Sequence, residues 1–118
     1  MTKPWHITRD DDRLTLSRHP APRFDLSAEA SLPLLRRLPL AQMVRQDMWR
    51  RLRGLRGFSP VVEVTRTPDG LRLRAGGTVA GRFPKPHAEA QIASLLHDPA
   101  YRARWQNCAR LTQGKDLL

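Results

Sequence analysis

Residues 1–23 alternate apolar and polar side chains in two short runs, as a β-hairpin does. One run surrounds Ile7, the other surrounds Leu14, and three consecutive aspartates at 10–12 lie between them. Aspartate is common in tight turns, so the pattern predicts two short strands joined at the aspartate run. The Pro-Ala-Pro sequence at 20–22 predicts an extended connector after the hairpin.

Residues 27–57 have the pattern of a basic helix that prolines interrupt. Ser27 can cap a helix, and the glutamate two residues later suits its first turn, so a short helical piece is predicted to begin there. Pro33 and Pro39 break this piece, and a longer helix is predicted from Pro39 to Leu55. Its apolar residues share one stripe, as in a helix that faces a core. The stripe consists of Leu40, Ala41, Val44, Met48, Leu52 and Leu55.

Residues 59–83 change to the period of two that is typical of strands, and they predict a β-meander. The sequence Thr67-Pro68-Asp69-Gly70 is a strong turn signal between two alternating runs. If these residues form the turn, the facing pairs are Val64 with Leu73, Val62 with Ala75, Glu63 with Arg74 and Thr65 with Arg72. The glycine pair at 76–77 predicts a second turn, followed by a third strand over 78–83.

Residues 86–111 predict two C-terminal helices. The first follows Pro84-Lys85-Pro86, and its apolar stripe consists of Ala88, Ile92, Leu95 and Leu96. Asp98 followed by Pro99 is an N-cap with proline at the first helical position, so a second helix is predicted to begin there. We expect this helix to carry Tyr101, Trp105 and Cys108 on one side.

These elements together predict one α+β domain over residues 1–118. In it a small antiparallel β-meander packs against three to four helices, and the N-terminal hairpin either extends the meander or stands apart. The single cysteine, Cys108, cannot form an internal disulfide, which favours a reducing, cytoplasmic location. We expect neither a secretory signal nor insertion into a membrane, because the apolar runs are short.

The predicted order of helix, three antiparallel strands and helix over residues 40–96 resembles the C-terminal half of a double-stranded-RNA-binding domain. The run GGTVAGRFPKPHAEAQIASLL carries the resemblance, since it leads from a hairpin into an alanine-spaced helix. In that family the last helix opens with small residues and a lysine pair that contact phosphates. This chain has Pro84-Lys85-Pro86-His87 there, so the resemblance implies a shared topology without that phosphate contact.

Basic residues are concentrated in the middle of the chain. The formal net charge is +10, and residues 36–82 contain eleven arginines against three acidic residues, a net +8. Codon bias in a GC-rich genome and phosphate recognition both favour arginine over lysine, but codon bias does not explain the clustering. A positive field of this size favours an anionic partner such as RNA, DNA, an acidic protein surface or an anionic membrane surface.

The candidate binding residues lie on the polar side of the predicted long helix and on the predicted sheet. Arginines that frame an aromatic ring are typical of nucleic-acid surfaces, because guanidinium groups hold phosphates and the ring stacks on a base. Trp49 either serves in this way or packs under the N-terminal hairpin, and the rarity of exposed large aromatics favours packing. The predicted site consists of Arg45, Trp49, Arg50, Arg53, Arg56, Arg72 and Arg74.

Motifs for catalysis or metal binding are not found in the sequence. The four histidines lack the spacing of metal ligands, and no phosphate loop, nucleophile elbow or pair of catalytic carboxylates is present. We therefore predict no enzymatic activity and no cofactor. The leading hypothesis is a small accessory or regulatory protein that binds nucleic acid. The alternative is an adaptor or inhibitor that docks on an acidic surface of a larger protein.

Overall fold

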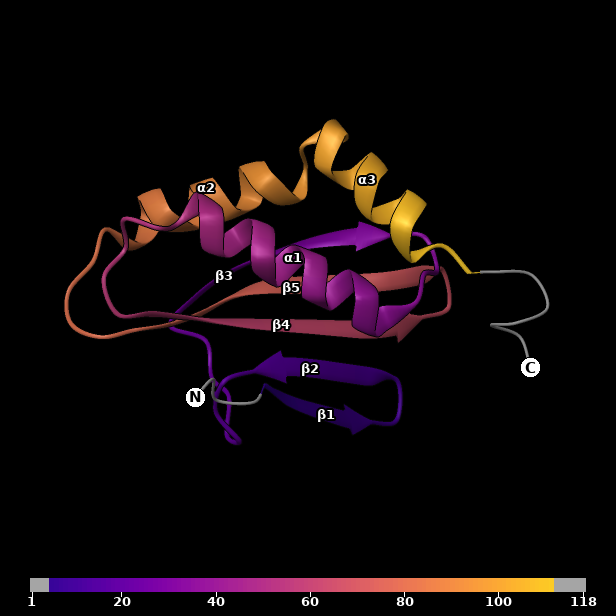
Figure 1. The fold of residues 1–118 in the computed structure, drawn as a ribbon, viewed down its shortest axis with the longest axis horizontal. Coiled ribbons are helices and arrows are strands. Elements are labelled where there is room, and N and C mark those ends of the chain that lie inside the picture. The colour runs from indigo at the N-terminus through magenta and orange to yellow at the C-terminus, as the bar shows by residue number, and fades with distance from the viewer. Residues whose placement is uncertain (1–4, 112–118) are drawn as a thin grey trace.

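The computed structural model describes residues 5–111, which form a five-stranded antiparallel sheet with three helices on one face (Figure 1). In chain order the elements are β1 (His6–Asp10), β2 (Arg13–Ser17), β3 (Leu26–Leu32), α1 (Arg37–Arg51), β4 (Phe58–Thr67), β5 (Gly70–Val79), α2 (Lys85–Leu96) and α3 (Pro99–Ala109). Across the sheet the strands follow the order β1-β2-β4-β5-β3. The predicted α+β architecture is confirmed, and the N-terminal hairpin extends the meander because β2 pairs with β4.

The hairpin of β4 and β5 has the predicted register. Thr67 faces Gly70 across the turn, and Val64 faces Leu73 while Glu63 faces Arg74. Strand side chains alternate between faces, so Val64 and Leu73 point toward the helices and are fully buried. Glu63 and Arg74 point to the other side, which we call the open sheet face.

Residues 26–32 form strand β3, so the prediction of a helical piece beginning at Ser27 is wrong. β3 pairs along the edge of β5, from Leu26 opposite Gly77 to Leu32 opposite Leu71. The segment alternates strictly, and pairing with β5 buries Leu26, Ala30 and Leu32 under the helices. Burial of this alternating set outweighs the helix preference of its alanines and glutamate, which amounts to only tenths of a kcal/mol per residue.

The glycine pair Gly76-Gly77 continues β5 straight through, so the predicted second turn and third strand over 78–83 are wrong. A Cβ atom on Gly76 would overlap the carbonyl oxygen of Leu26, and one on Gly77 would overlap that of Ser59. The two glycines therefore allow both neighbouring strands to approach β5 closely. Without a third strand in this meander, the topology that resembled the double-stranded-RNA-binding domain is absent.

We expect Gly77→Ala to lower the free energy of unfolding by about 1–3 kcal/mol, the usual cost of forcing extra atoms into packed space. The new methyl group would meet the backbone of β4, and Gly77 has a φ of +154°, which L side chains rarely adopt. Gly54→Ala is the matched control, because a Cβ there has no atom within 4 Å. Urea denaturation of both variants tests this, and equal stability of the two would contradict the close approach of the strands.

Helix α1 begins two residues before Pro39 and ends at Arg51, so the predicted span from Pro39 to Leu55 is wrong at both ends. Proline is tolerated in the first turn of a helix because the backbone N–H groups there have no partner within the helix. At the other end, the N–H of Leu55 donates to the carbonyl of Leu52 at 2.9 Å instead of continuing the helical ladder. Arg53 and Arg56 therefore lie in a turn and not on the helix.

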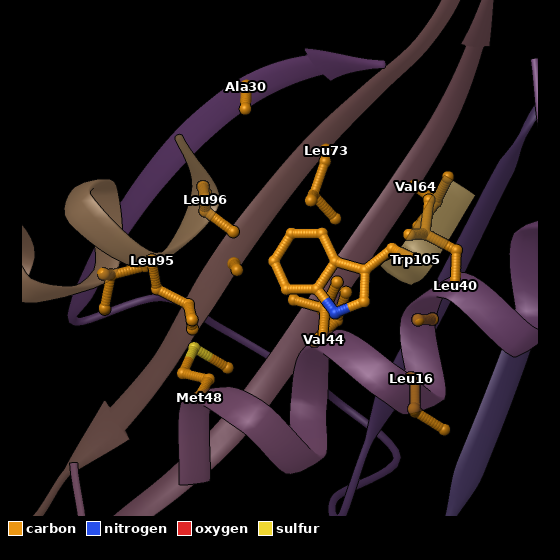
Figure 2. Packing of buried hydrophobic residues seen from close by; sticks show 14 of the residues in the cluster. Leu16, Ala30, Leu40, Val44, Met48, Val64, Leu73, Leu95, Leu96 and Trp105 are labelled. Atoms are coloured by element: carbon orange, nitrogen blue, oxygen red, sulfur yellow. The ribbon is translucent and has the colours of Figure 1, made fainter. Parts of the chain in front are cut away.

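Helix α3 begins at Pro99 as the sequence predicts, and Asp98 caps it by accepting from the N–H of Ala100 at 2.8 Å, while α2 begins at Lys85, one residue before the predicted boundary. The indole of Trp105 lies in the middle of the core, among side chains of α1, α2, β4 and β5 (Figure 2). Cys108 lies three positions after Trp105 on α3, as predicted for a shared side, but it is exposed and does not join the core. The inner stripe of α3 follows i, i+4 spacing and continues to Ala109, which is buried.

Candidate functional site

The solvent-facing side of α1 carries several cations around an exposed aromatic ring. We call this surface, together with the hairpin end and the turn that adjoin it, the α1 outer face. It consists of Arg45, Trp49 and Arg50 on α1, Trp5 and Arg18 at the open end of the hairpin, and Arg53 and Arg56 in the turn after α1. Trp49 is 47% exposed, so the prediction that it packs under the N-terminal hairpin is wrong. Its ring lies parallel to that of Phe58, with centroids 6.3 Å apart and an interplanar angle of 14°. Phe58 is buried and packs against the Trp49 indole, so the exposed part of the indole is held in a defined orientation.

Trp5 lies at the open end of the hairpin and packs, partly buried, against the core. Two guanidinium groups lie over its ring, Arg45 at 4.5 Å and Arg18 at 4.8 Å from the centroid. Such cation–π contacts hold long side chains in place. Partial burial lowers the pKa of Arg45, and the charge of the nearby Arg18 lowers it further. The hairpin thus fixes two like charges next to each other, an arrangement that an anion stabilises.

A shallow hollow lies between the hairpin and α1, beside these two arginines. Ile7 and Trp5 line it from the hairpin, and Gln42, Arg45 and Gln46 line it from the helix. Ile7 is exposed, and the two glutamines add neutral donors and acceptors. The surface therefore offers apolar, polar and cationic contacts, and Arg45 and Gln46 lie one helical turn before Trp49.

The other flank of Trp49 faces α3 and is organised by a buried acid. Asp47 is almost fully buried, accepts a hydrogen bond of 2.7 Å from the indole Nε1–H of Trp105, and pairs with Arg104. A second hollow lies on this flank, and Arg50, Tyr101 and Arg104 line it together with Asp47. Between residues 37 and 57 Asp47 is the only acidic residue, and because it points inward the α1 outer face carries no carboxylate from this segment.

Arg72 and Arg74 lie on the open sheet face, on the opposite side of the sheet from the helices. Arg74 is half-buried, with its guanidinium 4.0 Å from the Phe24 ring centroid and its Nε donating to Ser27 Oγ at 3.2 Å. Arg72 is exposed between Thr65 and Ser31. The predicted site residues therefore do not form one surface.

The open sheet face also carries balanced charge. One row across the sheet contains Glu63, Arg74 and Glu29, and the next row contains Arg13 beside Asp10. Arg13 forms an ion pair with Asp10 at 3.3 Å and lies 3.9 Å from Glu63. With carboxylates between its arginines, this face lacks the uniform positive field that phosphate binding needs.

Sequence reasoning missed Trp5 and Arg18 as members of the site. They are separated by twelve intervening residues but flank the two strands of one hairpin, so the hairpin brings them together at its open end. The predicted hairpin was the signal that could have found them, because it brings the residues before its first strand close to those after its second. Their contact with Arg45 depends on where α1 lies on the sheet, which no local pattern shows.

Within residues 5–111, no three histidine, cysteine, aspartate or glutamate side chains gather as metal ligands would. None of the three helices in this range is long and apolar enough to span a bilayer. Comparison with protein-family models, with curated proteins and with solved structures finds no match. A proposal for function must therefore rest on the chemistry of the surface itself.

Proposed function

We propose that this chain is a nucleic-acid-binding accessory protein that holds single-stranded RNA or DNA on the α1 outer face. The supporting observation is the exposed Trp49 ring, which is stacked on Phe58 and flanked by arginines of a segment, residues 37–57, whose single carboxylate, Asp47, is buried. Stacking of a base on an aromatic side chain contributes about 1–3 kcal/mol and tolerates any base. The arginines add contacts to the phosphates on either side.

Single strands fit this surface better than duplexes because a base inside a duplex has no free face for Trp49. The α1 outer face also ends at the turn 52–57, where Arg53 and Arg56 are exposed and continue the positive surface beyond the helix. A flexible strand can follow this change of direction, while a duplex is stiff over the width of a small domain. Arg72 and Arg74 are left out of the proposed interface because they lie on the opposite face of the sheet.

Binding is measured by fluorescence anisotropy with labelled single-stranded RNA, single-stranded DNA and duplex of about twelve nucleotides. We expect single strands to bind more tightly than the duplex, with quenching of tryptophan emission as a base stacks on Trp49. If five arginines each contact a phosphate, the log–log dependence of affinity on salt has a slope of about −3.5. A flat salt response, or no binding at low salt, would rule out the proposal.

The alternative is an adaptor or inhibitor that docks the same surface on an acidic protein. The exposed Trp49 and Ile7 would then be buried anchors, and the arginines would steer the encounter. A pull-down from nuclease-treated lysate separates the two functions. Retention of one stoichiometric protein after nuclease favours the adaptor, and loss of all bound material favours nucleic acid.

A further inference from the structure

A second group of arginines lies at the opposite end of α1 from Arg53 and Arg56. Arg37 begins α1 and precedes Leu40, Ala41 and Val44 by three, four and seven positions, so it lies on the helix side that faces the core. One of its terminal nitrogens, Nη1, is buried and has no hydrogen-bond partner among residues 5–111. A buried guanidinium nitrogen without an acceptor is costly, and native structures rarely keep one without a reason.

Arg9 and Arg66 lie on the same side of the sheet as Arg37. In the sheet Arg9 faces Leu14 and belongs to the row of Leu14 and Val64, whose side chains point toward the helices. Arg66 is two residues beyond Val64 and points the same way, near the end of β4, where its charge acts on Arg37. Both are exposed, so the helix does not seal this end of the sheet.

We call the region around Arg37, Arg9 and Arg66 the arginine corner. The charges that act on Arg37 there are mostly positive. Burial lowers the pKa of Arg37, and the positive charges of Arg66 and Arg9 lower it further, while the Asp12 carboxylate acts in the opposite direction. The backbone carbonyl of Asp12 accepts from the N–H of Arg66 at 2.8 Å, which holds the hairpin turn beside β4. Among the charges that act on Arg37, two guanidinium groups oppose one carboxylate, and the N-terminal end of the α1 dipole adds to the positive side.

We propose that Arg9, Arg37 and Arg66 form a binding site for a phosphate group. A phosphate dianion supplies acceptor oxygens to several guanidinium groups at once, and arginine forks match its geometry. The site takes either a free phosphate or the terminal phosphate of a larger molecule. This phosphate site does not depend on the proposed nucleic-acid interface, because none of its three arginines is part of the α1 outer face.

The direct test is calorimetric titration of the full chain with inorganic phosphate, with chloride at equal ionic strength as the reference. We expect Arg37→Gln to weaken phosphate binding at least about tenfold, the effect of losing one charge-assisted contact. Arg9→Gln and Arg66→Gln should each weaken it severalfold. Arg82→Gln is the matched control, because it removes the same charge from an exposed loop position that belongs to neither proposed site, and this variant should bind phosphate as tightly as the parent.

Stability in the absence of phosphate gives an independent readout. Arg37→Met removes a partly buried charge from beside two like charges and replaces it with an apolar chain, so we expect its melting temperature to rise by about 4 °C. Phosphate should then stabilise the parent more than Arg37→Met. If phosphate stabilises the parent, Arg37→Met and Arg66→Gln equally, the effect is general salting-out and the proposed site does not exist.

Two oligonucleotides distinguish the source of the phosphate. A 5′-phosphorylated single strand that binds the parent more tightly than its 5′-hydroxyl twin, with the difference lost in Arg37→Gln, identifies a terminal nucleic-acid phosphate. Equal binding of the two strands, together with titratable inorganic phosphate, identifies a free phosphate or a small phosphorylated molecule. Absence of phosphate binding in both experiments overturns the site but leaves the α1 outer face untouched.

Discussion

Reversing two charges, Arg45→Glu with Arg53→Glu, is expected to lower the affinity for single-stranded nucleic acid by more than about 100-fold. Each arginine is proposed to hold a phosphate, and loss of a charge-assisted contact costs about 1.5–3 kcal/mol before the added repulsion is counted. Arg45 is half-buried over Trp5 and Arg53 is exposed in the turn after α1. Anisotropy titrations at constant salt measure the change directly.

The fold should survive this double substitution. Arg45 gives up a contact with the Trp5 ring worth about 0.5–1 kcal/mol, and Arg53 is exposed. Arg72→Glu with Arg110→Glu is the matched control, since it makes the same change in net charge at exposed positions on the open sheet face and after α3. If both double variants lose binding equally, net charge alone drives the interaction, and if neither loses it, the α1 outer face is only a solvated surface.

Removing the carboxylate of Asp47 is expected to have the largest effect on stability. Asp47→Ala should lower the free energy of unfolding by about 3 kcal/mol, because it leaves the buried indole N–H of Trp105 without an acceptor. It also strands the guanidinium of Arg104, although that side chain is 47% exposed and regains water. The contact links α1 to α3, so guanidinium chloride denaturation followed by tryptophan fluorescence reports its loss.

Graded variants separate the contributions to this contact. Asp47→Asn keeps an oxygen that can accept from Trp105, so it should cost less than Asp47→Ala. Arg104→Ala should cost at most about 1 kcal/mol, because its head group is partly solvated. If Arg104→Ala is as damaging as Asp47→Ala, the ion pair and not the Trp105 hydrogen bond holds α3 on α1.

The sequence alone predicts well those elements whose patterns involve near neighbours. The β4–β5 register follows from one turn and a period of two, and the start of α3 follows from Asp98 and Pro99. Both are local preferences, which depend on residues within a few positions and not on contacts with distant segments. The sequence also predicts the basic middle segment from its composition, and the candidate arginines on α1 from their helical phase.

Failed predictions share one cause, which is competition between local preference and a distant partner. The segment 26–32 has the residues of a helix start, but β5 offers an edge that buries its alternate side chains. The pair Gly76-Gly77 has the sequence of a turn, but the backbones of β3 and β4 approach so closely there that only glycine fits. Both outcomes are decided by residues about fifty or fewer positions away, whose placement the segment itself does not encode.

Two charged residues within the apolar stripe of α1 were an overlooked sign of buried charge. Arg37 and Asp47 share the helical phase of Leu40 and Val44, so the pattern places them against the core without saying what they meet there. The tertiary structure supplies Trp105 and Arg104 for Asp47, and it supplies Arg9 and Arg66 for Arg37. Phase is a property of the chain, whereas the partner of a buried charge depends on which elements pack against the helix.

The sequence by itself therefore determined the α+β class, the β4–β5 hairpin, the C-terminal helices and the concentration of arginine. Only the tertiary structure decided that the predicted arginines lie on two opposite faces, with Arg45 and Trp49 on one and Arg72 and Arg74 on the other. A helix and a sheet each set the directions of their own side chains. Which side of the sheet the helix covers follows from burial of both apolar faces together, and that burial divides one basic segment into two surfaces of different charge.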